Sequence, residues 1–366
     1  MFDFSLPKLR IGNLVATLPI IQGGMGVGIS LSGLASAVAN QGGIGVIAVA
    51  GIGMQEPDSS KNYIEASVRA LRNEIQKVKT LTKGIVGVNI MVALSNFYEM
   101  ATVAINEGVD IIFAGAGLPL NLPSLISSSV KTKLVPIISS AKAANLITRR
   151  WFERYHYKPD AFVVEGPKAG GHLGFRLEQL TDANYQLENL IPEVVNEVKE
   201  LEKTIDGTIP VIAAGGVYNG YDINRFLSLG ASGVQMATRF VGTKECDASD
   251  SFKQAYIQCE EKDIVIINSP LGLPGRAIRN NFINNVEAGK KKPFSCPYHC
   301  IVTCNYKEAP YCIASALMQA KKGNLDNGFA FAGSNAYRVK EIVSVEHLIN
   351  ELREGFEEAS QNKYSK

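Results

Sequence analysis

The stretch Pro210–Phe240 decides the fold: it begins Pro-Val-Ile-Ala-Ala-Gly-Gly and ends Gly-Val-Gln-Met-Ala-Thr-Arg-Phe. Each of these two runs is apolar, has the length of a strand, and ends in small or polar residues. Tyr221–Leu229 between them has the length of a helix, so the pattern predicts a β-α-β unit. Gly215 and Gly216 carry no Cβ and allow a ligand to approach the backbone. Loops after strands seven and eight of a (β/α)₈ barrel commonly bind phosphate, so the stretch predicts a phosphorylated cofactor or substrate.

Similar apolar runs recur along the chain and alternate with segments of helical periodicity. They are rich in Val and Ile without alternation, which is typical of parallel strands covered on both faces. Eight such runs predict an α/β protein with a TIM (β/α)₈ barrel, and a doubly wound open sheet is the alternative. The expected strands are Leu18–Gln22, Gly45–Val49, Gly84–Ile90, Asp110–Ala114, Leu134–Ser139, Ala161–Glu165, Pro210–Ala214 and Gly233–Ala237.

Two interruptions of this alternation predict the domain organisation. A long connection follows Glu165, and a longer segment without a clear β-α pattern follows Phe240. Long insertions usually carry function. We therefore expect a barrel over residues 1–258, a cysteine-containing cap over 259–323, and a C-terminal segment over 324–366 whose helix, Val345–Glu358, returns to the barrel.

Composition excludes several classes of protein. The chain has 366 residues, 46% of them hydrophobic, and a net charge of +2, which gives no electrostatic reason to expect nucleic acid or a membrane surface as partner. Met1–Gly12 lacks the apolar core of a signal peptide. The apolar run Gly42–Met54 is too short to span a bilayer. We expect a soluble, cytoplasmic protein.

The loop Glu165–Gly174 presents one histidine in a frame of glycines, directly after the sixth expected strand. That position lies on the face of a (β/α)₈ barrel where active sites form. Imidazole transfers protons near neutral pH. His172 is therefore the candidate acid or base, and a structural histidine in a turn is the alternative.

Other polar and small residues fall at the same ends of strands, with less specific patterns. Asn89 ends the third expected strand, where its amide could read a flavin-like edge or cap the next helix. Gly23-x-x-Gly26-x-Gly28 is not the dinucleotide fingerprint. Arg239 could meet a phosphate or pair with Glu245. Two further pairs fit either the site or turns: Gly115 with Gly117, and Ser139 with Ser140.

Cys296, Cys300, Cys304 and Cys312 lie close together in the sequence. Their spacing, C-x₃-C-x₃-C-x₇-C, matches neither a zinc ribbon nor a ferredoxin motif. Spacings of four would place the first three on one face of a helix, with His299 adjacent. Buried free thiols are the more frequent outcome, so no metal is assigned, and a metal ion or an iron–sulfur cluster is the alternative.

Taken together, these motifs resemble the nitronate monooxygenase family, formerly called 2-nitropropane dioxygenases, which also includes FMN-containing enoyl-ACP reductases. The matching segments occur in the family's order, with a weaker match at Gly333-Ser-Asn. They are Pro19–Met25, Gly87–Ile90, Glu165–Gly174, Pro210–Gly216 and Gly233–Phe240.

The resemblance implies a TIM barrel with FMN at the carboxyl ends of the strands. By position, Gly24 and Met25 would lie against the isoalloxazine, and Asn89 would hydrogen-bond its edge. Lys168 belongs to the same set, although many relatives have Glu there. The residues that would surround the ribityl and phosphate groups are Gly170, Gly171, Gly215, Gly216, Gln235, Met236, Ala237 and Thr238.

His172 matches the active-site histidine of the family, a base that takes the proton α to a nitro group in the oxygen-using members. The resemblance thus implies oxidation of alkyl nitronates with O₂. An NAD(P)H-dependent enoyl-ACP reductase is the first alternative, and a barrel that binds a phosphorylated ligand without redox chemistry is the second. The expected partners are a small nitronate or an enoyl thioester, and O₂. A homodimer is left open.

Overall fold

A barrel of eight parallel strands forms the core of the protein, in a computed structural model that describes residues 5–291 and 293–364. The strand order is β3-β11-β10-β8-β7-β6-β5-β4, and backbone hydrogen bonds of 2.9 Å from Gln22 to Ile44 and from Ile44 to Ile20 join the two ends of the sheet. The predicted (β/α)₈ barrel is confirmed, and the open sheet is excluded. The strands are β3 (Ile20–Gln22), β4 (Gly45–Ala48), β5 (Val86–Met91), β6 (Ile111–Gly115), β7 (Lys133–Ile138), β8 (Phe162–Glu165), β10 (Val211–Ala214) and β11 (Gly233–Met236).

Alternation along the strands separates two hydrophobic layers. Ile21, Val46 and Phe113 belong to a cluster inside the barrel, whereas their neighbours on the strands pack outward against helices. The hairpin β1 (Leu9–Ile11) and β2 (Leu14–Ala16) contributes to the inner cluster. Continuing the same alternation places inward positions near the carboxyl ends of β5, β8 and β11 at the barrel mouth, where the sequence has Asn89, Glu165 and Gln235.

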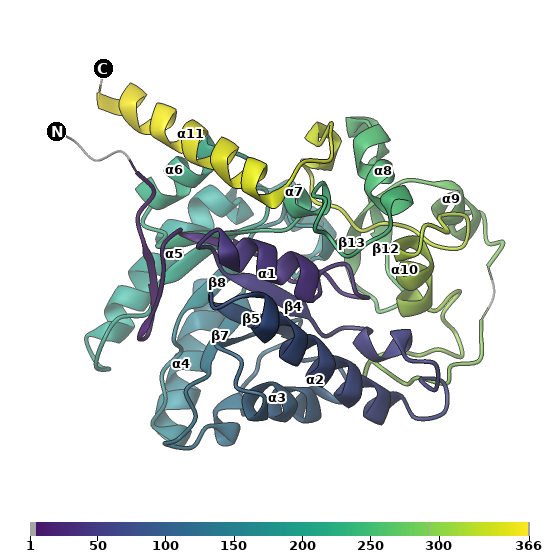
Figure 1. The fold of residues 1–366 in the computed structure, drawn as a ribbon, viewed down its shortest axis with the longest axis horizontal. Helices are drawn as coiled ribbons and strands as arrows, with labels where there is room; N and C mark the ends of the chain where they lie inside the picture. Colours follow the sequence, from purple (N-terminus) through teal and green to yellow (C-terminus); the bar gives the residue numbers. More distant parts are fainter. Residues whose placement is uncertain (1–4, 292, 365–366) are drawn as a thin grey trace.

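A ring of helices covers the strands (Figure 1). The helix α2 shows why: Leu71, Ile75 and Val78 are buried on one face, and the Asn62 side chain accepts a hydrogen bond from the N–H of Glu65 as the N-cap. The β6–β7 connection contains only a 3₁₀ turn, Leu122–Leu125. The first six helices of the ring are α1 (Ser32–Asn40), α2 (Tyr63–Leu81), α3 (Phe97–Asn106), α4 (Ala141–Tyr155), α5 (Leu187–Glu202) and α6 (Gly220–Ser228).

The ring ends with α11 (Val345–Tyr364), which packs along α6 and also contacts α1 (Figure 1). Arg239, in the short helix α7 (Thr238–Val241), forms an ion pair of 2.6 Å with Glu351 of α11. Its guanidinium also lies 4.5 Å from the ring centre of Tyr218. The predicted pairing of Arg239 with Glu245 is therefore wrong: Arg239 pairs with Glu351, and the carboxylate of Glu245 accepts a hydrogen bond from the N–H of Val345.

The segment between α7 and α11 builds a cap beside the barrel mouth (Figure 1). Its sheet pairs β12 (Ile264–Asn268) with β13 (Pro274–Ile278), and β13 pairs with β9 (Gly171–His172) from the loop after β8. Phe282, Tyr311 and Phe329 belong to a separate hydrophobic cluster under this sheet. The helices of this segment are α8 (Asp250–Gln258), α9 (Asn281–Glu287) and α10 (Ile313–Lys321).

The chain between α9 and α10 is a long loop that contains the cysteine motif. The predicted helix face across Cys296, Cys300 and Cys304 is wrong: in the described residues of this loop the backbone forms turns and extended segments. Pro297 interrupts the motif and has no N–H to donate, and His299 adopts the left-handed conformation at φ 44°. The cysteines are therefore brought together by the turns of this loop and not by the spacing of a helix.

Within 5–291 and 293–364, no helix is both long and apolar enough to cross a membrane. The start of the segment Met1–Gly12, from which the absence of a signal peptide was predicted, lies outside the described residues.

Candidate active site at the barrel mouth

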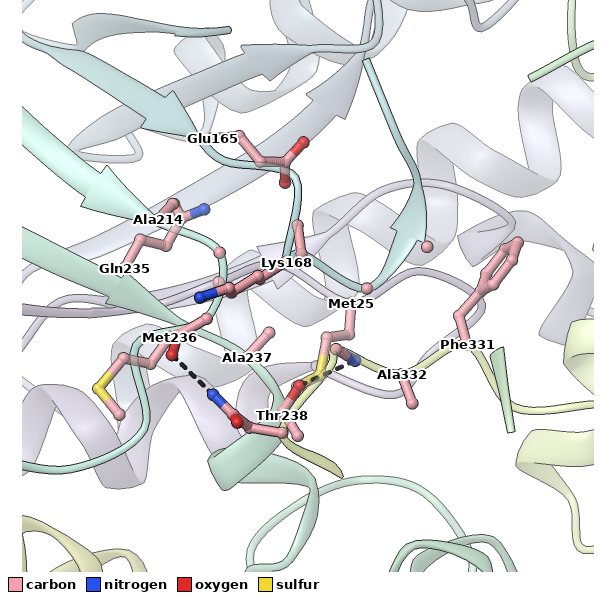
Figure 2. A pocket seen from close by; sticks show the side chains of 18 of the residues that line it. Met25, Glu165, Lys168, Ala214, Gln235, Met236, Ala237, Thr238, Phe331 and Ala332 are labelled. Atoms are coloured by element: carbon pink, nitrogen blue, oxygen red, sulfur yellow. Dashed lines mark hydrogen bonds between the residues drawn. The ribbon is translucent and has the colours of Figure 1, made fainter. Parts of the chain in front are cut away.

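Two adjoining cavities open at the carboxyl ends of the strands. One has a volume of about 220 Å³ and lies beside the loops after β10 and β11. The other, of about 400 Å³, extends beneath the cap. Glu165, Gln235 and Phe331 line both cavities, so the two form one continuous site. Figure 2 shows these three side chains around the smaller cavity with Met25 and Lys168.

The structure brings the predicted site residues together in these cavities. Asn89 and His172 line the larger cavity, and Gly24 and Gly171 line both. The other predicted residues line the smaller cavity: Met25, Lys168, Gly170, Gly215, Gly216, Gln235, Met236, Ala237 and Thr238. Of these, Gln235 also reaches the larger cavity. Their roles as ligands remain predictions.

The smaller cavity has the backbone geometry of a phosphate cradle. Gly215 and Gly216 have φ values of 90° and 94°, where a side chain would be strained. A Cβ on Gly215 would lie 2.8 Å from the carbonyl oxygen of Gly166. Beside them, the N–H groups of Thr238 and Arg239 begin α7 and therefore have no acceptor within the helix. These residues fit a phosphorylated cofactor such as FMN.

The C-terminal segment fastens this cradle from outside. The N–H of Gly333 donates to Thr238 Oγ1 at 3.2 Å, and Asn335 Nδ2 donates to the carbonyl oxygen of Gly216 at 2.8 Å. The N–H of Ser334 donates to the carbonyl oxygen of Lys168 at 3.1 Å. Only the weak Gly333-Ser-Asn match in the sequence pointed to this contribution.

Asn89 lies against Gly24 at the floor of the larger cavity. A Cβ on Gly24 would overlap the side chain of Asn89, so only glycine leaves both backbone and amide in place. The alternative role of Asn89 as a helix cap is excluded, because Asn96 occupies the N-cap position of the next helix, α3. The amide is thus available to a ligand in the cavity.

Glu165 is the residue that sequence reasoning left without a role. It ends β8, and its carboxyl group lies at the junction of the two cavities. Burial raises the pKa of Glu165 to about 7. Its one signal in the sequence was its position as the last strand residue before the glycine-rich loop. A carboxyl group that titrates near neutrality in a cavity is a candidate functional group.

His172 lies on β9 with its imidazole facing the larger cavity. Burial lowers the pKa of His172 to about 4, so the ring is neutral at physiological pH. A hydrogen bond of 2.7 Å joins His172 Nε2 to Ser269 Oγ of the cap, and Phe331 packs edge-on with ring centres 5.1 Å apart. The cap thus orients the imidazole, and a neutral imidazole can accept a proton.

Arg276 supports the histidine loop and does not contact the cavities. Its buried Nη1 donates to the carbonyl oxygens of Pro167 at 2.7 Å and Ala169 at 2.5 Å, and burial lowers the pKa of Arg276 to about 10. Arg279 instead pairs with Glu287 at 2.9 Å on the surface. Both arginines therefore have structural roles.

The wall of the larger cavity is mainly apolar. Met91 ends β5, Leu118 lies in the β6–β7 connection, and Leu273, Ile301 and Leu317 come from the cap. Ser139 also lines this cavity, whereas Ser140 caps α4 by accepting a hydrogen bond of 3.3 Å from the N–H of Ala143. A substrate with an apolar portion fits this space.

Comparisons with known proteins agree with this geometry. A model of the family described as nitronate monooxygenase matches residues 9–355. A "probable nitronate monooxygenase" of Staphylococcus aureus (strain Newman) is 29% identical over 297 residues, which is 73% of this chain and 77% of that protein. FabK from Thermotoga maritima superposes with a TM-score of 0.73 at 27% identity, covering 95% of each chain.

Another similar protein carries a different name. A "(3aS,4S,5R,7aS)-5-hydroxy-7a-methyl-1-oxo-octahydro-1H-indene-4-carboxyl-CoA dehydrogenase" of Mycobacterium tuberculosis (strain ATCC 25618 / H37Rv) is 30% identical over 274 residues, or 75% of this chain. The match spans 66% of that relative, just under two thirds of its length. A nitroalkane oxidase from Streptomyces ansochromogenes shares the fold, with a TM-score of 0.70 at 22% identity and coverage of 94% and 97%.

Proposed function

Because this chain belongs to the nitronate monooxygenase family, we propose that it is an FMN-dependent oxidoreductase that oxidises alkyl nitronates with O₂. Membership of the family makes the protein an oxidoreductase, which leaves the non-redox barrel without support. The observation that carries the proposal is the neutral, half-buried imidazole of His172 in a cavity continuous with the glycine cradle.

The residues of the smaller cavity would hold FMN. The N–H groups around Gly215, Gly216 and Thr238 would bind its phosphate, and the ammonium group of Lys168 would add a positive charge at the cavity edge. Asn89 and Gln235, the inward residues at the mouth, would hydrogen-bond polar atoms of the ring system. When bound, FMN supplies the two-electron acceptor of the reaction.

His172 would act on the substrate in the larger cavity. For a neutral nitroalkane, the imidazole would take the proton from the carbon α to the nitro group, and Ser269 would fix the orientation of the ring. The apolar wall would exclude water from the reacting carbon. A nitronate supplied as such needs no deprotonation, so His172 would then serve only to bind it.

An enoyl thioester reductase that uses NADH or NADPH is the second candidate. The observation in its favour is the apolar larger cavity of about 400 Å³, which has room for an acyl chain. The likeness to FabK, at 27% identity across 95% of the chain, supports the same candidate. Both candidates use the same cradle and differ in the source of electrons.

Anaerobic flavin reduction distinguishes the two candidates. The FMN-loaded protein is mixed without oxygen with propionate 3-nitronate, NADH or NADPH in separate experiments, and the absorbance of oxidised flavin is followed. Bleaching by nitronate alone is the result expected from the proposal. Rapid bleaching by either nicotinamide would instead support the reductase, and an acyl-carrier substrate would be the next to test.

A further inference from the structure

Four cysteines meet around a small cavity in the cap, apart from the residues assigned to flavin and base. Cys296, Cys300 and Cys304 come from the loop between α9 and α10, and Cys312 is the N-cap residue of α10. All four, with His299, line a cavity of about 30 Å³. That volume holds a water-sized particle or an ion. All four are free thiols.

Each of the four thiols lies near the other three. All six pairs that Cys296, Cys300, Cys304 and Cys312 can form lie close enough for two thiolates to repel each other. A cation bound among four thiolates would offset this repulsion.

The cysteine cavity has further features of a thiolate site. The backbone N–H of His299 donates to Cys296 Sγ at 3.4 Å, a type of contact that supports metal-bound sulfur. The ring of His299 packs on Tyr306 with centres 5.1 Å apart. Four soft sulfur donors select zinc or an iron–sulfur cluster over magnesium or calcium.

The same loop forms part of the wall of the larger active-site cavity. Cys300 and Ile301 line both that cavity and the cysteine cavity, as do Ile313 and Ala314 of α10. The loop also pairs with the connection after β5, through hydrogen bonds of 3.1 Å from the N–H of Ser95 to the Cys300 carbonyl and 3.0 Å from Val302 to Ala93. Whatever fixes the cysteines therefore fixes the wall.

We propose that Cys296, Cys300, Cys304 and Cys312 bind a thiophilic metal centre, either a zinc ion or an iron–sulfur cluster, which joins the α9–α10 loop to the start of α10. Within the described residues, no three His, Cys, Asp or Glu side chains stand at metal-binding geometry, and the proposal therefore requires the four sulfurs to move closer together when the metal binds. Four thiolates complete either a tetrahedral zinc site or a [4Fe–4S] cluster.

Metal analysis of protein produced and purified without oxygen tests this proposal and does not depend on the flavin reaction. Elemental analysis and an acid-labile sulfide assay distinguish the two sources. A zinc site gives about one zinc and no sulfide per chain. A cluster gives about four iron and four sulfide per chain. Flavin absorbs where clusters do, so these assays replace an optical spectrum.

Cysteine variants locate the metal. Cys304→Ser and Cys312→Ser should each lose most of it, because three ligands remain of four. Cys246→Ser is the matched control: Cys246 is buried elsewhere and bonds the carbonyl oxygen of Ile29, so this variant should keep the metal. Retention of the full metal content by Cys304→Ser and Cys312→Ser would overturn the proposal.

The wild-type protein keeps the test decisive even where a variant fails to fold. Its four cap thiols should resist alkylation in the native protein and react after a strong chelator removes the metal. Removal of the metal should also speed proteolysis within the α9–α10 loop. Wild-type protein that contains neither zinc nor iron, and that binds no metal when Zn²⁺ or iron with sulfide is added, would also contradict the proposal.

Discussion

At the scale of single residues, the site depends on two side chains whose pKa values burial moves in opposite directions. His172 is held neutral, with a pKa of about 4, and Glu165 is held near its titration point, with a pKa of about 7. Desolvation disfavours the charged form of each, which lowers the pKa of a base and raises that of an acid. A neutral base that lines the same cavity as a carboxyl group titrating near neutrality suits proton removal from carbon.

Replacing His172 by Ala should separate the two classes of substrate. We expect turnover of a neutral nitroalkane to fall about 10²–10⁴-fold, the usual contribution of a general base. Turnover of the preformed nitronate should fall much less, and FMN content should stay the same. Steady-state kinetics with both substrates checks this. Full activity of the variant on nitroalkane would remove His172 from the role of base.

Glu165 should make nitronate binding sensitive to pH. Its folded pKa is raised, so the carboxyl group is neutral below pH about 7 and ionised above it. Ionisation places a negative charge beside an anionic substrate, and the KM for nitronate should rise about tenfold at alkaline pH, as one unit of pKa coupling gives. Glu165→Gln should give a flat KM between pH 6 and 9, a range chosen to span about one to two units around that pKa. The same rise in Glu165→Gln would exclude this carboxyl group as its cause.

The sequence revealed the local requirements of this site and missed those created by packing. The positions of Gly215, Gly216 and the loop around His172 at the barrel mouth were predictable, because these residues directly follow predicted barrel strands, and their roles toward a ligand stay predictions. Glu165 was not, because a carboxylate at a strand end has no distinctive pattern until burial shifts its pKa. Ser269 was not either, because its contact with His172 joins segments far apart in the chain.

At the scale of elements, the eight barrel strands were predictable because strands covered on both faces read as continuous apolar runs. The cap was not predictable to the same extent. The strand β9 has two residues, and only its pairing with β13, His172 opposite Gly275, makes it a strand. For the cysteine loop, the spacings of four predicted a helix that does not form, because Pro297 interrupts it.

One added methyl group should disrupt the loop that follows β10. Gly215→Ala would place a Cβ 2.8 Å from the Gly166 carbonyl oxygen, so we expect the loops to separate and FMN to be lost on purification. Gly289→Ala is the control, because its φ of 68° imposes similar strain, about 1–2 kcal/mol, but nothing lies within 4 Å. FMN content per chain is the measurement. Equal FMN content in both variants would show that the cradle does not need its glycine.

At the scale of the whole molecule, the helix that completes the barrel lies far along the sequence from the last barrel strand. The cap is inserted between the eighth strand, β11, and α11, the helix that ends the ring beside α6 and α1. The barrel's stability therefore depends on a helix separated from its own strand by the entire cap. The ion pair between Arg239 and Glu351 links the two sides of that insertion.

Two glycines at the α6–α11 contact should respond in opposite directions. A Cβ on Gly220 would overlap the backbone at Phe356, and we expect Gly220→Ala to lower the free energy of unfolding by about 1–3 kcal/mol. Gly355 lies within α11 with its nearest neighbour at 3.4 Å, so Gly355→Ala should raise helix propensity and stabilise by up to about 1 kcal/mol. Urea denaturation measures both. A destabilised Gly355→Ala variant would mean that this face is packed more tightly than the separation of 3.4 Å indicates.

The pairing of β9 with β13 has a consequence for anyone who exchanges caps between relatives to change substrate preference. His172 and Gly275 are partners in one sheet, and Ser269 in the adjoining turn orients the imidazole. A transplanted cap would therefore bring its own position for the base, together with its own pocket wall. A graft that alters β13 or the turn at Ser269 would change both reactivity and selectivity. A chimera meant to change selectivity alone has to keep the recipient's β13 and the recipient's turn at Ser269.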